Sequence, residues 1–117
     1  MKSYLLSIYQ PQGPTPPPEE LRNVMREVSV ILDDARRTGA WVFNGGLEPP
    51  GAARVVRDRA GDALVTDGPY IETKEYLGGF LLVRAADEDT ALQWARRLAR
   101  AVTPLAVEVR AFQPDAA

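Results

Sequence analysis

The stretch EELRNVMREVSVILDDARRTG, residues 19–39, decides the fold class, because it predicts one long amphipathic helix beside strand-like segments. Its two leading glutamates suit the positive end of the helix dipole, and Gly39 supplies a left-handed stop. The predicted apolar stripe follows the three-and-four spacing of a buried helix face and consists of Leu21, Val24, Met25, Val28, Ile31, Leu32 and Ala35.

The segments around this helix predict strands and one more helix. A proline-rich connector, 10–18, separates the helix from a first strand at 2–9. A second helix starts at the N-cap Asp87 and stops before Pro104. The other predicted strands are 40–47, 53–58, 63–66, 79–84 and 105–112, with 59–62 as a hairpin loop. This order predicts an α+β, ferredoxin-like split βαβ fold with an inserted β-hairpin.

Two of these strands predict a second copy of the chain. The strand at 2–9 and the segment Phe80–Val83 carry apolar residues on both faces. Two helices cover only one face of such a sheet, so the other face needs a cover. We therefore expect a homodimer with two-fold symmetry, packed sheet against sheet.

Composition narrows the class of protein and of site. The 117 residues predict a single domain, 1–117, with a frayed tail at 113–117. A net charge of −2 argues against nucleic acid as a partner. No apolar run reaches about 18 residues, so we expect no membrane partner and a cytoplasmic location.

Without cysteine or histidine, tetrahedral zinc sites and Cys-His or Ser-His pairs are excluded. We expect no cofactor and no metal, although Asp67, Glu72 and Glu75 offer oxygen ligands to a hard cation.

Candidate chemistry gathers in the turn-rich segment Thr66–Val83. Asp67 has two interpretations: it accepts backbone amides in an Asx-type turn, or it lies in an apolar cleft as a general base. Glu72 is the candidate second carboxylate, and Lys74 either forms a solvated ion pair or presents a cation to a ligand. The structural residues of this loop are predicted to be Gly68, Pro69, Gly78 and Gly79.

Aromatic residues offer walls for a pocket. Tyr9, Trp41, Tyr70 and Phe80 would suit a planar ligand, and Ser7 could point its hydroxyl into the same cavity. The competing interpretation is that these strand residues belong to the core or to an interface, which is the commoner fate of aromatics on strands. Both interpretations stay open at the level of sequence.

The motif Asp67-Gly68-Pro69-Tyr70, followed by Glu72-Thr73-Lys74-Glu75 and Leu77-Gly78-Gly79-Phe80, resembles the signature of the YCII-related family, in its Asp-Gly-Pro-Phe (DGPF) subgroup. The similarity extends to Tyr4–Tyr9, Gly45–Pro49 and Val107–Arg110. It implies a dimeric α/β barrel with a cleft near the motif loop. It also implies an association with extracytoplasmic-function sigma factors, beside which such proteins are often encoded.

The chemistry implied by the resemblance is open. A related member is a dehydrochlorinase acting on a chlorinated aromatic ring, and others carry a His-Asp pair, which this histidine-free chain cannot supply. We expect a homodimer that binds a small organic molecule. If it is an enzyme, it is a cofactor-independent lyase or isomerase in which Asp67 is the base, Glu72 a second carboxylate and Lys74 a stabiliser of negative charge. The alternative is a non-catalytic metabolite-binding or regulatory module, linked to a sigma factor or to a biosynthetic pathway.

Overall fold

The sheet of the molecule is four-stranded and antiparallel, with the order β2-β5-β1-β6. The computed structural model describes residues 1–114, so the end of the predicted frayed tail, 115–117, lies outside the described residues. The four strands are β1 (Lys2–Pro11), β2 (Trp41–Gly46), β5 (Glu75–Ala85) and β6 (Ala106–Ala111). This order, with one hairpin inserted between β2 and β5, confirms the α+β class and is consistent with a ferredoxin-like arrangement.

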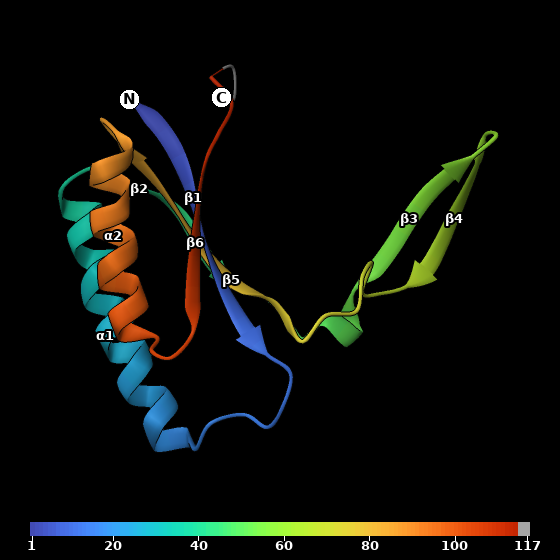
Figure 1. Cartoon of the computed structure of the whole chain (residues 1–117), viewed down its shortest axis with the longest axis horizontal. Helices are drawn as coiled ribbons and strands as arrows, with labels where there is room; N and C mark the ends of the chain where they lie inside the picture. Colours follow the sequence, from blue (N-terminus) through green and yellow to red (C-terminus); the bar gives the residue numbers. More distant parts are fainter. Residues whose placement is uncertain (115–117) are drawn as a thin grey trace.

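Two helices lie side by side on one face of this sheet (Figure 1). They are α1 (Pro18–Arg37) and α2 (Glu88–Ala101), and α2 begins at the predicted N-cap Asp87, whose side chain accepts the N–H of Thr90 at 2.8 Å. No helix within residues 1–114 combines the length and the apolar content needed to cross a bilayer.

The core forms between these helices and one side of the sheet. Tyr4 and Leu6 of β1 lie beside Val83 and Leu81 of β5, and all four are at most 3% exposed. The small side chains of α2 let the helix approach the sheet closely, and its buried residues are Ala91, Ala95, Leu98 and Ala101. The predicted stripe of α1 is buried only in part. Leu21 and Met25, near the start of α1, are 41% and 55% exposed because the first turns extend past the strands (Figure 1).

The opposite face of the sheet has no helix over it. Since side chains alternate along a strand, it carries Leu5, Ser7 and Tyr9 of β1 together with their neighbours on the adjoining strands. We call this the open face and define it by Leu5, Ser7, Tyr9, Phe80, Leu82 and Glu108. Three of its apolar members, Leu5, Phe80 and Leu82, are half-buried in the single chain.

The inserted hairpin stands away from the rest of the molecule (Figure 1). We call it the arm, residues Arg54–Asp67; it consists of β3 (Arg54–Arg59) and β4 (Asp62–Asp67), which pair with each other in a separate two-stranded sheet. Its turn is Ala60-Gly61, with φ of 50° and 91°, the pattern of a two-residue hairpin turn. A short 3₁₀ helix, η1 (Pro50–Ala52), leads into it. The helices and the four-stranded sheet form what we call the body.

Three predicted boundaries are wrong. β1 continues through Gln10 and Pro11, which pair with Tyr76 and Glu75 and were assigned to the connector. β5 begins at Glu75, four residues before the expected start, because the register of β1 against β5 shifts between Ile8 and Tyr9 and the strand continues past this irregularity. The turn of the arm has two residues, not the four of 59–62.

Candidate functional site

The predicted motif segment forms the junction between the arm and the body. β4 ends at Asp67 and β5 begins at Glu75, so residues 68–74 carry the chain from one sheet to the other. The far end of this segment is tied to the end of β1, because the N–H of Gln12 donates to the carbonyl of Lys74 at 3.1 Å. The side chain of Gln12 donates to the carbonyl of Thr73 at 3.0 Å. The end of the segment next to β5 is therefore held by two hydrogen bonds from one residue.

Gly68 is placed by a close approach of two backbones. Its N–H donates to the carbonyl of Ala53 at 2.7 Å, and a Cβ atom at position 68 would lie 2.7 Å from the Cβ of Ala53. Real Cβ atoms do not approach so closely, so only glycine fits without movement of the backbone. Gly78 lies at the register shift, where an added Cβ would meet the side chain of Gln10, and an added Cβ on Gly79 would lie 3.2 Å from the carbonyl oxygen of Gly45.

Asp67 lies in a different environment from both of those expected for it. It is the last residue of β4 rather than part of a loop, and its side chain is 87% exposed. The carboxylate lies 3.5 Å from Nη1 of Arg54, its cross-strand partner. Within residues 1–114 no backbone amide donates to this carboxylate, and its exposure leaves it in water rather than among apolar neighbours. The cause is the strand pairing, which continues through Arg54 and Asp67 to the base of the arm.

Tyr70 braces the base of the arm. Its hydroxyl accepts a hydrogen bond from Nη2 of Arg57 at 2.9 Å, and the guanidinium carbon lies 5.1 Å from the ring centroid. The arginine therefore uses both a hydrogen bond and a cation–π contact on one residue. Tyr70 as a whole nevertheless stays 67% exposed.

A hollow of about 720 Å³ lies beside this base, between the motif segment, the end of β1 and the stretch that follows β2. Tyrosines and prolines dominate its wall: Tyr9, Tyr70, Tyr76, Pro49, Pro50 and Pro69. Glu48 and Glu75 are the charged residues of its lining, which contains no lysine or arginine from the described part of the chain. The hollow therefore offers aromatic surface together with negative charge.

The structure brings only some of the predicted site residues to this hollow. Tyr9, Tyr70 and Pro69 line it, whereas Asp67, Glu72 and Lys74 are exposed outside its lining. Ser7 is 3% exposed and lies farther along the open face, opposite Phe80. The Phe80 ring lies 6.0 Å from that of Phe43.

Trp41, expected in the pocket wall, lies elsewhere. Its Nε1 donates to Oδ1 of Asn44 at 2.7 Å, and the guanidinium carbon of Arg36 lies 4.9 Å from the centroid of its ring. The side chain packs against the core. The first residue of β2 points to the helix-covered side of the sheet, so Trp41 belongs with the core and not with the hollow.

Other lining residues were missed by reasoning from the sequence. Glu48, Pro49 and Pro50 follow β2, and Leu77 belongs to the early part of β5 together with Glu75, which was considered only as an oxygen ligand for a cation. The stretch Gly45–Pro49 was marked only as part of the resemblance, and that signal could have pointed to the first group. The second group was hidden because β5 was expected to start later.

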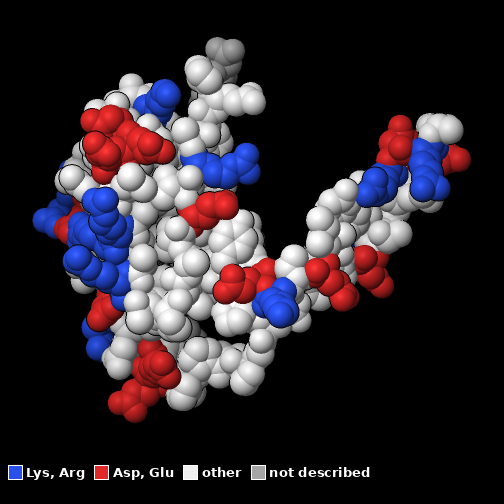
Figure 2. Space-filling model, viewed as in Figure 1, with Lys and Arg blue, Asp and Glu red and all other residues white. Residues whose placement is uncertain are grey.

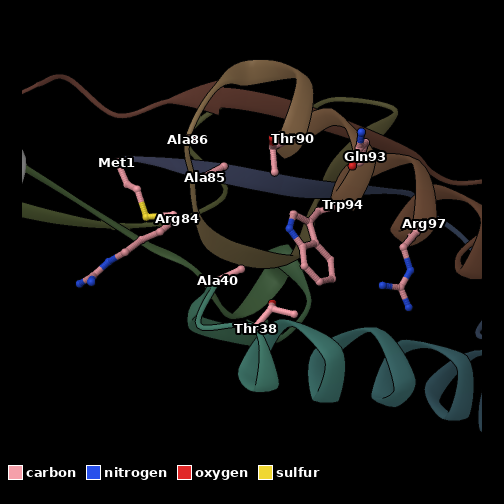
Figure 3. A pocket seen from close by; sticks show the side chains of 10 residues that line it. All are labelled: Met1, Thr38, Ala40, Arg84, Ala85, Ala86, Thr90, Gln93, Trp94 and Arg97. Carbon is pink, nitrogen blue, oxygen red and sulfur yellow. The ribbon is translucent and has the colours of Figure 1, made fainter.

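A second, smaller hollow of about 330 Å³ lies at the other end of the molecule, between the end of α1 and the start of α2 (Figure 3). Trp94 and Arg97 project into it from α2 (Figure 3). Nη2 of Arg97 donates to Oδ2 of Asp34 at 2.6 Å, and its guanidinium lies 5.3 Å from the centroid of the Trp94 ring. Asp34 also pairs with Arg37. Of the two arginines in its lining, Arg84 and Arg97, the second is thus already paired within the protein.

The carboxylates of the motif segment do not form a cation site. Within the described range 1–114, no three acidic side chains lie close enough together to hold a metal ion. Asp67, Glu72 and Glu75, the oxygen ligands considered from the sequence, are accordingly not assembled into one group.

Comparison with known proteins identifies a family and a similar protein. A family model described as the YCII-related domain matches residues 1–113. An uncharacterized protein of Rhizobium meliloti (strain 1021) is 41% identical over 83 residues, which cover 71% of this chain and 67% of that relative. The family match spans the body, the arm and the hollow together.

Proposed function

The chain belongs to the YCII-related family, and on that premise we propose that it is a homodimer that binds a small neutral or cationic aromatic molecule in the hollow at the base of the arm. The observation that carries the proposal is the lining of this hollow, in which three tyrosines accompany two carboxylates. Tyrosine rings contribute apolar area at low conformational cost and attract cations over their faces.

Charge decides the class of ligand. Glu48 and Glu75 in the lining disfavour an anion, and Lys74, the cation considered for that role, lies outside the lining. A neutral or cationic aromatic molecule gains contact with the tyrosine rings without that repulsion. A hollow of about 720 Å³ is within the range of sites that hold small organic molecules.

The homodimer is supported by the open face. Leu5, Phe80 and Leu82 form an apolar strip with no helix over it, and such strips are typical of surfaces that pack on another protein. A second copy presents the same strip, so the two faces can pack by two-fold symmetry.

Binding is favoured over proton-transfer catalysis. The scheme of a lyase or isomerase needs Asp67 near the substrate, in a setting that favours proton uptake. Asp67 is instead exposed and paired with Arg54. The function is therefore better described as recognition of a metabolite, either by the homodimer alone or by the homodimer within a regulatory complex.

A pair of fluorinated probes tests the ligand class. We expect 4-fluorobenzylammonium to show ¹⁹F line broadening with the protein and 4-fluorobenzoate to show much less. Glu75→Gln should weaken binding of the cationic probe about 3- to 10-fold, because it removes one nearby negative charge. Glu27→Gln, which removes an exposed carboxylate from α1, is the matched control and should change nothing. Equal binding of both probes, or equal effects of both variants, would contradict the proposal.

Asp67→Asn separates binding from catalysis. It should leave both the affinity for the cationic probe and the unfolding midpoint nearly unchanged, because an exposed ion pair contributes only about 0–1 kcal/mol. A clear loss of probe affinity in this variant would show that Asp67 takes part in binding, and it would favour the catalytic scheme.

A further inference from the structure

The surface of the arm is unusual for a part of one chain. Every residue of β3 and β4 is exposed except Val55, which is half-buried. The cross-strand neighbours Val56 and Val65 are 64% and 59% exposed, and Leu64, on the opposite face of the hairpin, is 44% exposed. An isolated two-stranded hairpin is only marginally stable in water, and its free edges and apolar side chains invite pairing with another surface.

The base of the arm holds it away from the body. The Gly68–Ala53 hydrogen bond and the Arg54–Asp67 ion pair lie at this base. Arg57, farther along β3, contacts Tyr70 of the junction. Figures 1 and 2 show the arm projecting on the side of the open face, with space between the two. The arm is thus positioned to reach a second molecule.

The accessible surface and the radius of gyration of the single chain indicate how much surface a partner could bury. Its accessible surface is 8626 Å², about 2,300 Å² more than the roughly 6,300 Å² of a compact monomer of 12.8 kDa. The radius of gyration is 16.2 Å, against about 13 Å for a compact chain of 117 residues. Burying this excess on two copies would give an interface of about 4,600 Å², within the range of obligate homodimers.

The charges of the arm favour a partner identical to itself. Three arginines and three aspartates lie along it, so that it is neutral overall and of mixed sign: Arg54, Arg57, Arg59, Asp58, Asp62 and Asp67. A neutral arm of mixed sign has no preference for nucleic acid or for a strongly charged protein. Mixed charges can, however, pair with the same pattern on a two-fold related copy.

We propose that the arm is a clasp that lies against a second copy of this chain, with the Val56–Val65 pair at the centre of the contact. The hollow lies at the root of this clasp, so the second copy covers its open side and the site is incomplete without it. The clasp adds the second copy to the proposed function, and it rests on that proposed function for the identity of the ligand site. By thermodynamic linkage, ligand binding and dimer formation then strengthen each other by the same factor.

Sedimentation equilibrium of single-charge variants tests the clasp. Val65→Arg or Val56→Arg should weaken the dimer at least about 100-fold, because each places an unpaired charge at the centre of an apolar contact. Val30→Arg is the matched control: Val30 is 55% exposed on α1, away from the arm, and its replacement should leave the dimer intact. Circular dichroism of all three should match the wild type, because none of these valines is buried in the single chain.

One further variant, Val65→Thr, and the cationic probe separate the possible failures. If Val65→Arg fails to fold, Val65→Thr keeps the shape of the side chain and should still weaken the dimer measurably. A monomeric wild type, or a dimer that resists the arm variants as it resists Val30→Arg, would overturn the clasp. If the arm variants dissociate the dimer but the wild type binds no 4-fluorobenzylammonium, the clasp stands and the proposed ligand site fails. We expect Val65→Arg to lose both the dimer and most of its probe affinity.

Discussion

The body and the arm are two β-structures of the same chain, and they differ in how much of their apolar surface the chain itself buries. In the body, β1 lies between two strands and under two helices, and Leu6 is fully buried. In the arm, two strands have only each other, and Val56 opposite Val65 remains mostly in water. The body can account for its own stability by burial of apolar surface, whereas the arm cannot. The difference indicates which part of the chain is built for another molecule.

The largest effect is expected from truncation of the core of the body. Leu6→Ala removes a fully buried side chain and should lower the free energy of unfolding by about 2–5 kcal/mol, measured by urea titration. Leu64→Ala is the matched change in the arm and should cost much less. Its cost should also vary with protein concentration, because the arm is covered only in the dimer. A loss at Leu64 as large as that at Leu6 and independent of concentration would mean that the arm packs on its own body.

A smaller effect is expected at the junction of the two regions. Gly68→Ala forces the backbone away from Ala53 and disrupts the 2.7 Å hydrogen bond between them, with an expected cost of about 1–3 kcal/mol. Gly51→Ala is the control, since a Cβ there meets nothing within 4 Å. Thermal unfolding of both variants measures the difference. Equal midpoints would show that the arm does not depend on this close approach.

The smallest effect concerns the stability of the fold at acid pH, and it is confined to the body. The hydroxyl of Thr90, and then its backbone N–H, donate to the carboxylate of Asp87 and lower its pKa below the ordinary value. A carboxyl with a lowered pKa stabilises the fold above its ordinary pKa, and this stabilisation is lost as the pH falls through the folded value. Asp87→Asn should therefore flatten the acid limb of the stability profile. An acid limb identical to that of the wild type would show that this cap does not contribute to it.

Much of the body could be predicted from local pattern. The apolar stripe of 19–39 and the cap at Asp87 predicted both helices, and the order of helices and strands along the chain predicted the α+β class. The ends of strands were less predictable, because Gln10 and Pro11 are held in β1 by pairing with a distant strand. Gly78-Gly79 predicted a bulge or a close approach of two backbones at the start of a strand, and the structure has both features there, but within β5 and not at its start.

The site could be predicted only in part. Tyr9 and Tyr70 were selected as aromatic walls, and the structure places both at the hollow. Asp67 was selected for its neighbours in the motif, yet its environment is set by Arg54 across the hairpin. That pairing depends on the register of the arm, which the sequence pattern did not extend to its base. The direction of the arm depends on the close approach of Gly68 to Ala53, a contact that no local pattern encodes.

Hydrogen exchange of the arm tests the central claim most directly. The backbone amides of residues 54–67 are to be compared at protein concentrations well above and well below the dissociation constant of the dimer, in the wild type and in Val65→Arg. We predict that the arm amides of the wild type are protected at high concentration and exchange rapidly on dilution. In Val65→Arg they should exchange rapidly at both concentrations, while the amides of β1 and β5 remain protected throughout. Arm amides equally protected in both proteins at every concentration would contradict the account.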